Sequence, residues 1–332
     1  MDRKESLSKF LKETEKVYGA GAVMLGNQKP THCDVIPTGS LKIDMALGVG
    51  GFPKGRITEV FGAESSGKTT LMLQTAANCQ KAGGKVLMVD VESSLDPSYA
   101  TALGLNLDDL IISQPGLAED ALGIIKTALM MQAFDMIILD SIAAMTPRAV
   151  VDGEPGDSHM AIVARLLSRN LSMLHRAAVE SNTCLAFVNQ IRDNIGVMYG
   201  EKTTTVGGRA MKFYASMRIQ VSRSTLNKDG EEVIGNKVKV KVVKNKLAPP
   251  YKECEAEILY GQGFSKTSEL VDIGSDMGIV EKAGSWYSYE GERIGQGRDN
   301  AVEFLTQNPK TADEIEGKIR AALEGEDVEQ SA

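Results

Sequence analysis

The chain has 332 residues, 42% hydrophobic and 24% charged, a composition typical of a soluble globular protein with one sizeable core and a smaller appendage. No segment approaches the roughly 20 apolar residues that span a bilayer, and charges throughout the first thirty residues argue against a signal peptide, so we expect a cytoplasmic protein. The formal net charge of −7 argues against a simple basic nucleic-acid binder, and the four cysteines and three histidines lack the spacing of a zinc site.

The first predicted element is an amphipathic helix over residues 6–18, which ends near Gly19. Its apolar side is formed by Leu7, Phe10, Leu11, Val17 and Tyr18. An apolar stripe must be buried somewhere. The pattern alone leaves the chain's own core and a neighbouring subunit as equal alternatives.

From about residue 34 the pattern alternates between strands and helices. Near-continuous apolar runs predict buried strands over residues 56–62, 85–92, 134–140 and 184–190, and a helical period covers residues 117–132. Such runs are typical of a mostly parallel sheet with helices on both faces. The sequence therefore predicts an α/β core.

The stretch 191–209 has four glycines and three consecutive threonines, without a helical or strand period, so we expect a functional loop that is neither helix nor strand. Beyond it, period-2 alternation predicts antiparallel strands over 217–223, 237–246 and 254–260. From about residue 265 the pattern indicates a small α+β unit whose last helix covers 311–323.

The segment GAESSGKT, residues 62–69, matches the phosphate-binding pattern GxxxxGK[ST] between a predicted strand and a predicted helix. Gly62 and Gly67 allow backbone N–H groups to converge on phosphate oxygens, Lys68 adds a positive charge, and the Thr69 hydroxyl is a candidate Mg²⁺ ligand. A second glycine run, GVGGF at 48–52, precedes a strand instead of following one, so a turn is expected there.

Polar residues at the ends of the other predicted strands complete a candidate site for nucleotide hydrolysis. Asp140 fits the role of an acid that holds Mg²⁺, and Glu92 fits that of a water-positioning acid, for which Asp90 competes. Gln190 ends its strand at the same edge of the sheet, where it would sense a γ-phosphate and move the following loop.

Eight co-linear motifs identify the family that the chain resembles. GAESSGKTTL, VDVESSLDPSYA, IILDSIAAMTP, GDSHM, NQIRDNIGVMYG, GGRAMKFYAS, KVVKNK and EKAGSWYSYEGERIGQG occur in the order and spacing of the bacterial RecA family of recombination ATPases. The resemblance runs from about residue 5 to about residue 323. It implies a P-loop NTPase core with a mostly parallel central sheet extended by antiparallel strands. It also implies a division into a polymerisation helix with linker (1–33), the core with two DNA-binding loops (34–264) and a C-terminal domain that captures duplex DNA (265–332).

The resemblance assigns the roles in ATP and Mg²⁺ binding residue by residue. The phosphate loop comprises Gly62, Ala63, Glu64, Ser65, Ser66, Gly67, Lys68, Thr69 and Thr70, and the adenine side comprises Asp96, Tyr99, Tyr260 and Gly261. Glu92 matches the acid that activates water, Asp140 the Mg²⁺-linked acid and Gln190 the γ-phosphate sensor. Lys244 and Lys246 match lysines that reach the ATP of the adjacent subunit.

The resemblance likewise implies that single-stranded DNA binds at two loops, 152–160 and 191–209. The matching positions are Met160, Arg165, Arg192, Ile195, Gly196, Met198, Tyr199, Gly207, Gly208 and Arg209. Glycines, hydroxyls and wedge-like side chains suit largely sequence-tolerant binding. In the C-terminal domain, Lys282, Arg293 and Arg298 are the cations assigned to double-stranded DNA.

The implied function is that of an ATPase that forms helical homo-oligomeric filaments on single-stranded DNA and pairs them with homologous duplex, in DNA repair and the SOS response. Departures from the family pattern are Ala63 for a usual proline, Ser93-Ser94 for His-Ala, Asn194 at an often basic position and a short acidic tail. These departures leave room for a phage-borne relative and put cleavage of an SOS-type repressor in doubt. Rival readings are a hexameric helicase or clock-type ATPase, and a DNA-binding paralogue without catalysis.

Overall fold

The computed structural model describes residues 2–19, 21–26, 33–153, 159–193, 203–229 and 232–330. The chain divides into two compact units, residues 1–34 and 35–332, which are described separately. The first unit contains helix α1 (Arg3–Tyr18), which confirms the predicted N-terminal helix. None of its residues is buried, and Leu7, Phe10, Val17 and Tyr18 are between 53% and 76% exposed.

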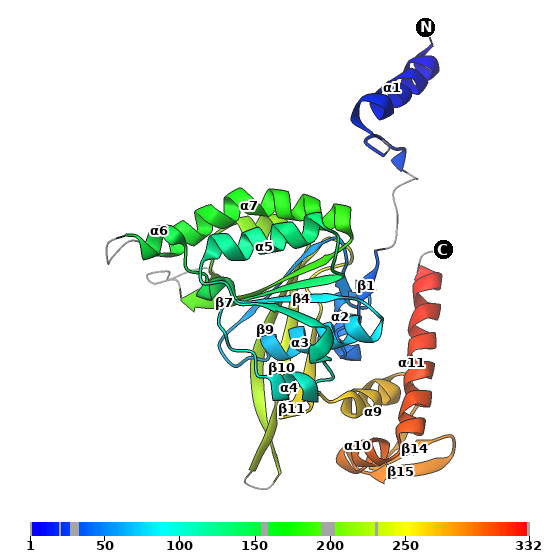
Figure 1. The fold of residues 1–332 in the computed structure, drawn as a ribbon. Helices are drawn as coiled ribbons and strands as arrows, with labels where there is room; N and C mark the ends of the chain where they lie inside the picture. Colours follow the sequence, from blue (N-terminus) through cyan, green and yellow to red (C-terminus); the bar gives the residue numbers. More distant parts are fainter. Residues whose placement is uncertain are drawn as a thin grey trace. The chain divides into compact units, whose positions relative to one another are not determined.

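A ten-stranded sheet forms the centre of the second unit, with the order β12-β11-β10-β9-β3-β7-β6-β4-β5 and with β8 paired to β7 (Figure 1). Six neighbouring strands run parallel: β9 (Met217–Asp229), β3 (Ile57–Gly62), β7 (Cys184–Asp193), β6 (Met136–Asp140), β4 (Val86–Asp90) and β5 (Leu110–Ser113). Antiparallel strands extend the sheet beyond β9: β10 (Glu232–Asn245), β11 (Glu253–Leu259) and β12 (Gly263–Phe264). The predicted mostly parallel sheet with an antiparallel extension is confirmed.

Alternate residues of a strand point to opposite faces of the sheet, and the central strands are apolar at successive positions. Both faces are therefore apolar, and helices cover each of them. In β4, Val86 and Met88 belong to the apolar cluster that includes α3, whereas Leu87 and Val89 belong to the cluster that includes α5 and α7. Figure 1 shows α5 and α7 side by side over one face. The helices of this core are α2 (Leu41–Leu47), α3 (Lys68–Lys81), α4 (Pro97–Ala102), α5 (Ala118–Met130), α6 (Arg148–Val151), α7 (His159–Ser181) and α8 (Ala210–Tyr214).

The remaining core elements are short. They are the strand pair β1 (Val35–Ile36) and β2 (Phe52–Pro53), and the 3-10 turns Leu107–Asp109 and Ile142–Ala144. The predicted turn at 48–52 is confirmed, since Gly48 caps α2 in the left-handed conformation.

The C-terminal part has its own apolar cluster, which includes Leu270, Ile294, Leu305 and Ile315. It is built from α9 (Lys266–Asp276), the antiparallel sheet of β13 (Glu281–Ala283), β14 (Trp286–Tyr289) and β15 (Glu292–Gln296), and the helices α10 (Arg298–Gln307) and α11 (Pro309–Gln330). The last helix is longer at both ends than the predicted 311–323. Among the described residues, no helix combines the length and apolar character needed to cross a membrane.

The expectation that 191–209 contains neither helix nor strand is wrong at both ends of the segment. Strand β7 continues to Asp193 and pairs with β8 (Thr203–Thr205) as an antiparallel hairpin, with Ile191 opposite Thr205. The two arms are held together by backbone pairing and consist mostly of threonine and charged residues, so they carry no apolar period. Residues 194–202 lie outside the described residues.

Candidate functional site

The phosphate loop connects the end of β3 to the start of α3, as predicted. A Cβ at Gly62 would lie 2.0 Å from the Val221 carbonyl oxygen, and Gly67 has φ +95°, so both positions require glycine. Gly67 caps α3, whose N-terminal N–H groups and partial positive charge favour an anion. The Ser66 hydroxyl is buried without a hydrogen-bond partner among the described residues, and a phosphate oxygen would fit that need.

Lys68 is only 7% exposed and lies inside this loop. Its Nζ donates to the Ala63 carbonyl at 2.6 Å. Burial lowers the pKa of Lys68, while the nearby Asp140, Glu92 and Glu64 carboxylates raise it. A buried cation whose bonded partner is a neutral carbonyl is suited to receive an anionic ligand.

Thr69 and Asp140 meet at the start of α3. The Thr69 hydroxyl donates to Asp140 Oδ2 at 3.0 Å, and Asp140 is 2% exposed. Burial raises the pKa of Asp140 to about 6. A hydroxyl and a carboxylate are oxygen ligands that suit Mg²⁺, which also takes phosphate oxygens and water. The part of the chain that the structure describes contains no cluster of three or more His, Cys, Asp or Glu side chains that could hold a metal.

Glu92 lies in the loop after β4 and faces the same edge of the sheet. The Ser141 hydroxyl donates a short hydrogen bond to Glu92 Oε1, and Gln190 Nε2 donates to the same oxygen at 3.4 Å. The competing acid, Asp90, is fully buried and accepts from the backbone N–H groups of Ser94 and Leu95. Asp90 therefore shapes the loop, and Glu92 is the acid that remains exposed at the site.

A pocket of about 370 Å³ is lined by the phosphate loop and the first residues of α3. Tyr99 and Tyr260 line it, and the Tyr99 hydroxyl shares a 2.9 Å hydrogen bond with the Thr70 hydroxyl. Asp96 caps α4, and its pKa is lowered by hydrogen bonds from the Ser98 hydroxyl and from backbone N–H groups. Gly261, the other predicted adenine neighbour, follows Tyr260 with φ +74° and is not among the lining residues.

Sequence reasoning missed three further lining residues of this pocket: Arg223, Asn236 and Ile258. They come from β9, β10 and β11, and their approach to the phosphate loop depends on the register of the antiparallel strands. No motif in the sequence marks them.

A second hollow of about 350 Å³ lies beside the phosphate loop and is lined by Ala63, Glu64, Gln190, Ile191 and Arg192. The two sides of this hollow are the phosphate loop and the first arm of the hairpin. Gln190, the predicted γ-phosphate sensor, and Arg192, a predicted DNA-binding residue, therefore line the same hollow.

Lys244 lies near the end of β10 and Lys246 directly follows this strand, and both lysines contact helix α8. Lys244 Nζ donates to the carbonyls of Lys212 at 2.5 Å and Phe213 at 3.2 Å, and Lys246 Nζ donates to Phe213 at 3.5 Å. Burial and the neighbouring Lys246 and Arg218 lower the pKa of Lys244 to about 8. Neither lysine lines the two hollows at the phosphate loop of its own subunit.

The described part of the predicted DNA-binding set lies around the first turns of α7 and at the end of the hairpin. Met160 is 57% exposed and Arg165 is exposed on α7. Gly207 and Gly208 have positive φ, and a Cβ on Gly207 would lie 2.5 Å from Leu167 Cδ1. Arg209 caps α8. Ile195, Gly196, Met198 and Tyr199 lie outside the described residues.

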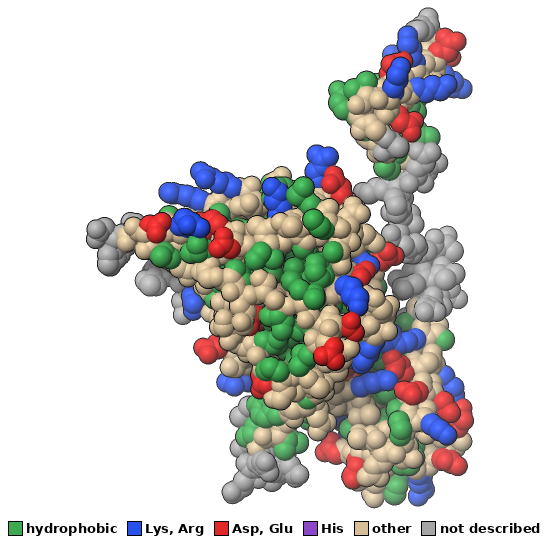
Figure 2. All heavy atoms as spheres, in the orientation of Figure 1, with side chains coloured by type: hydrophobic (Ala, Val, Ile, Leu, Met, Phe, Trp, Pro, Cys, Tyr) green, Lys and Arg blue, Asp and Glu red, His purple; other side chains and the backbone are tan. Residues whose placement is uncertain are grey.

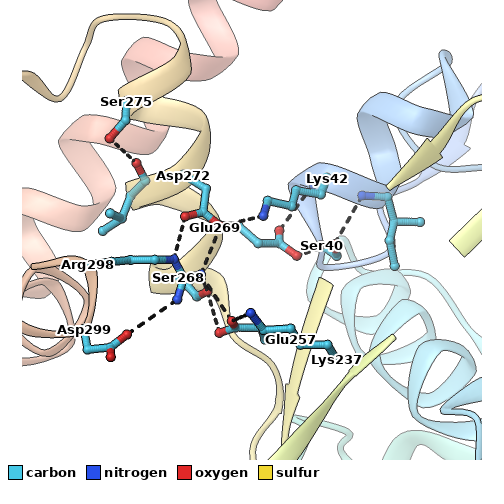
Figure 3. A network of polar contacts seen from close by, with 12 residues as sticks. Ser40, Lys42, Lys237, Glu257, Ser268, Glu269, Asp272, Ser275, Arg298 and Asp299 are labelled. Atoms are coloured by element: carbon cyan, nitrogen blue, oxygen red, sulfur yellow. Dashed lines mark hydrogen bonds and ion pairs between the residues drawn. The ribbon is translucent and has the colours of Figure 1, made fainter. Parts of the chain in front are cut away.

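The three cations predicted for duplex DNA have different surroundings. Lys282 and Arg293 lie over the rings of Tyr287 and Trp286, at 5.4 and 4.5 Å from the ring centroids. Arg298 instead joins a polar network between α9 and the core (Figure 3). Its guanidinium contacts Asp272 at 2.7 and 3.0 Å and Glu257 at 3.3 Å. The guanidinium of Arg298 is thus already engaged within the chain.

Comparison with known proteins agrees with this geometry over nearly the whole chain. The family model of the RecA N-terminal domain matches residues 5–265, and that of the RecA C-terminal domain matches residues 268–324. Protein RecA of Streptomyces ambofaciens is 51% identical over 323 residues, covering 97% of this chain and 87% of the relative. Protein RecA of Thioalkalivibrio sulfidiphilus is 53% identical over 321 residues, covering 96% of this chain and 94% of the relative. The chain therefore belongs to the RecA family of recombination ATPases.

Proposed function

We propose that this protein is an ATP-dependent DNA recombinase that forms a helical filament on single-stranded DNA and pairs it with a homologous duplex. The observation that carries the proposal is the contact between Glu92 and Gln190. It links the acid of a hydrolytic site to the residue that precedes the paired hairpin arms Ile191–Asp193 and Thr203–Thr205. A subunit built in this way couples nucleotide chemistry to a DNA-binding segment.

The phosphates of ATP bind in the loop 62–69, where Lys68 exchanges the Ala63 carbonyl for β- and γ-phosphate oxygens. Mg²⁺, held by the Thr69 hydroxyl and through water by Asp140, offsets phosphate charge when bound. The adenine lies in the 370 Å³ pocket against Tyr99 and Tyr260. This assignment is supported by the unpartnered Ser66 hydroxyl and by the oxygen-donor pair at the start of α3.

Glu92 orients the attacking water and accepts its proton, while the Ser141 hydroxyl fixes the carboxylate. Gln190 bonds the γ-phosphate and loses that bond after hydrolysis. The hairpin arm that begins at Gln190 then changes its position, and DNA is released.

Lys244 and Lys246 act on the ATP of the adjacent subunit by stabilising negative charge on the γ-phosphate. Two observations support action in trans: both ammonium groups contact α8 of their own chain, and neither lines the hollows at its own phosphate loop. The hollow bounded by Gln190 and Glu64 is open for groups from a neighbour. ATP binding and assembly are then one linked equilibrium.

Assembly of the filament uses exposed apolar surfaces of the two units. Helix α1 leaves its stripe uncovered in its own unit, and a helix exposing Phe10 at 55% and Tyr18 at 76% needs a partner surface. The edge strand β5 exposes Ile111 and Ile112, and Met130 and Met131 at the end of α5 are 69% and 74% exposed. Figure 2 shows hydrophobic side chains gathered on the face of the core below α5. We assign this edge to the α1 of a neighbouring subunit.

Duplex DNA is captured by the C-terminal domain, where Lys282 and Arg293 beside aromatic rings are the cations we retain for that task. A cytoplasmic location completes the proposal.

The test is the ATPase rate with and without single-stranded DNA, combined with negative-stain images of the same mixture. DNA-stimulated hydrolysis with helical filaments supports the recombinase, whereas closed rings support the helicase. The Lys68→Ala variant should abolish both nucleotide binding and ATP-dependent filaments, because it removes the cation of the phosphate loop. Undiminished strand exchange by that variant would overturn the assignment of the loop.

A further inference from the structure

A buried carboxylate lies in the strand that leads to the phosphate loop, although the nucleotide site makes no use of it. Glu59 is in β3, three residues before Gly62, and is 0% exposed in a strand whose residues are all buried. Burying a charge is unfavourable unless the charge is paired and hydrogen-bonded. The contacts of Glu59 therefore indicate what this carboxylate does.

One oxygen of Glu59 is connected to the DNA-binding hairpin through Asn189, which is also fully buried. Asn189 Nδ2 donates to Glu59 Oε1 at 2.8 Å and to the Val206 carbonyl at 2.8 Å. The Asn189 Oδ1 accepts the backbone N–H of Gln190 at 2.9 Å. A single amide thus holds both ends of the hairpin and the residue that contacts Glu92.

The other oxygen of Glu59 is connected to the strand that carries the trans lysines. It accepts from Nε of Arg218, which is 8% exposed and lies 4.7 Å from the centroid of the Phe61 ring. In the sheet, Arg218 is opposite Glu59 on one side and opposite Lys244 on the other.

Lys244 is also connected to the hairpin through α8, because its Nζ donates to the carbonyls of Lys212 and Phe213 in that helix. Helix α8 starts four residues after Val206, the residue held by Asn189. Two routes therefore join the hairpin to Lys244: the chain from Val206 into α8, and the buried contacts Asn189–Glu59–Arg218.

We infer that Glu59 is a positioning residue that couples the paired hairpin arms 190–193 and 203–206 to Lys244, so that DNA bound at these arms sets the placement of the lysine offered to the adjacent ATP. The inference rests on the proposed DNA role of the hairpin and the proposed trans role of Lys244. A carboxylate suits this position because both of its oxygens are acceptors and both of its neighbours are donors. A displacement of Val206 that shifts the Asn189 amide is passed through the carboxylate to Arg218, since packed interiors transmit small shifts.

Glu59→Gln tests the coupling with almost no change in shape. The glutamine side chain has one acceptor oxygen and one donor NH₂ group, whereas Asn189 and Arg218 both present donors. The NH₂ group must therefore face one of these two donors, and that contact is lost. A matched control is Glu269→Gln, because Glu269 is also a glutamate with 1% exposure that accepts from a side chain and a backbone N–H, Ser40 and Lys42. That carboxylate joins α9 to the start of α2, and among the described residues its hydrogen bonds go to Ser40 and Lys42 rather than to the hairpin arms or β10.

The full-length variants are compared with the wild type at saturating ATP, with and without single-stranded DNA. In Glu59→Gln we expect DNA stimulation of the ATPase rate to fall at least tenfold, while the affinity for an ATP analogue stays within threefold. The control should keep wild-type stimulation. Hydrogen exchange gives a second readout: DNA plus ATP analogue should protect the amides of 203–206 in the wild type and the control, but not in Glu59→Gln.

Stimulation within twofold of wild type in a folded Glu59→Gln protein overturns the inference. Where Glu59→Gln does not fold, Asn189→Ser decides, because it removes the amide contacts and leaves the Glu59–Arg218 pair intact. The same tenfold loss supports coupling, and unchanged stimulation refutes it. An absence of DNA stimulation in the wild type would instead refute the proposed function, so the two failures are distinguishable.

Discussion

Replacing Arg298 by alanine separates a structural role of this cation from the DNA-binding role that the family resemblance implies. Its guanidinium makes three contacts of 2.7–3.3 Å with the carboxylates of Asp272 and Glu257, and joins α10, α9 and β11 (Figure 3). Hydrogen bonds to charged groups contribute about 1.5–3 kcal/mol each to stability. The side chain of Arg298 is 30% exposed and Asp272 keeps a second partner in Lys42 at 2.6 Å, so this sum must be discounted for solvent screening.

We therefore expect Arg298→Ala to lower the free energy of unfolding by about 2–3 kcal/mol, which corresponds to a fall in Tm of about 3–4 °C for one cooperative transition of a chain of 332 residues. Scanning calorimetry measures the fall, and binding of a labelled duplex to the folded variant below its transition measures the DNA role. The control is Arg293→Ala, whose cation lies over the Trp286 ring and should contribute less than about 1 kcal/mol. A Tm unchanged within 1 °C, accompanied by a loss of duplex binding as large as that of Arg293→Ala, would refute the structural role.

Three other predictions concern the nucleotide site, the DNA-binding hairpin and a buried acid. Glu92→Gln should bind ATP and DNA normally but hydrolyse ATP about 10²–10⁴-fold more slowly, because the amide cannot accept a proton; single-turnover rates check this, and normal turnover would move the role to another group. Alanine at both Met198 and Tyr199 should weaken binding of single-stranded DNA and spare the DNA-free ATPase; unchanged affinity in fluorescence anisotropy would contradict the assignment of the loop. Burial raises the pKa of Glu269 to about 7, above its ordinary value, so the contribution of this group to stability falls as pH rises from about 4.5 through 7. Chemical denaturation at pH 5 and 8 should therefore show a smaller loss of stability in Glu269→Gln than in the wild type. An equal pH dependence of the two proteins would argue against a raised pKa.

The sequence by itself predicted the architecture of the core, because buried parallel strands require continuous apolar runs and a phosphate loop requires glycines at fixed places. The strands 57–62, 86–90 and 136–140, the helix 118–130 and the turn at 48–52 were all predictable from such local rules. The same rules failed for 191–193 and 203–205, because these arms are mostly threonine and charged residues that pair through the backbone, which leaves no apolar period.

The position of the two acids in the sequence does not distinguish Asp90 from Glu92; the family resemblance favours Glu92, and the tertiary structure gives the physical reason. Both are acids at the end of one strand, but the side chain of Asp90 is turned into the loop, where two backbone N–H groups bond it. A similar limit applies to Arg298, which resembles a surface cation in the sequence and lies in an ion-pair network in the fold.

The contacts of Glu59 likewise depend on strands that are 130 and 159 residues away along the chain. Sequence patterns report which face of an element is buried, and motifs report groups that act within a few residues of one another. The partner of a buried polar group is instead set by sheet order and register, which exist only once distant strands have paired.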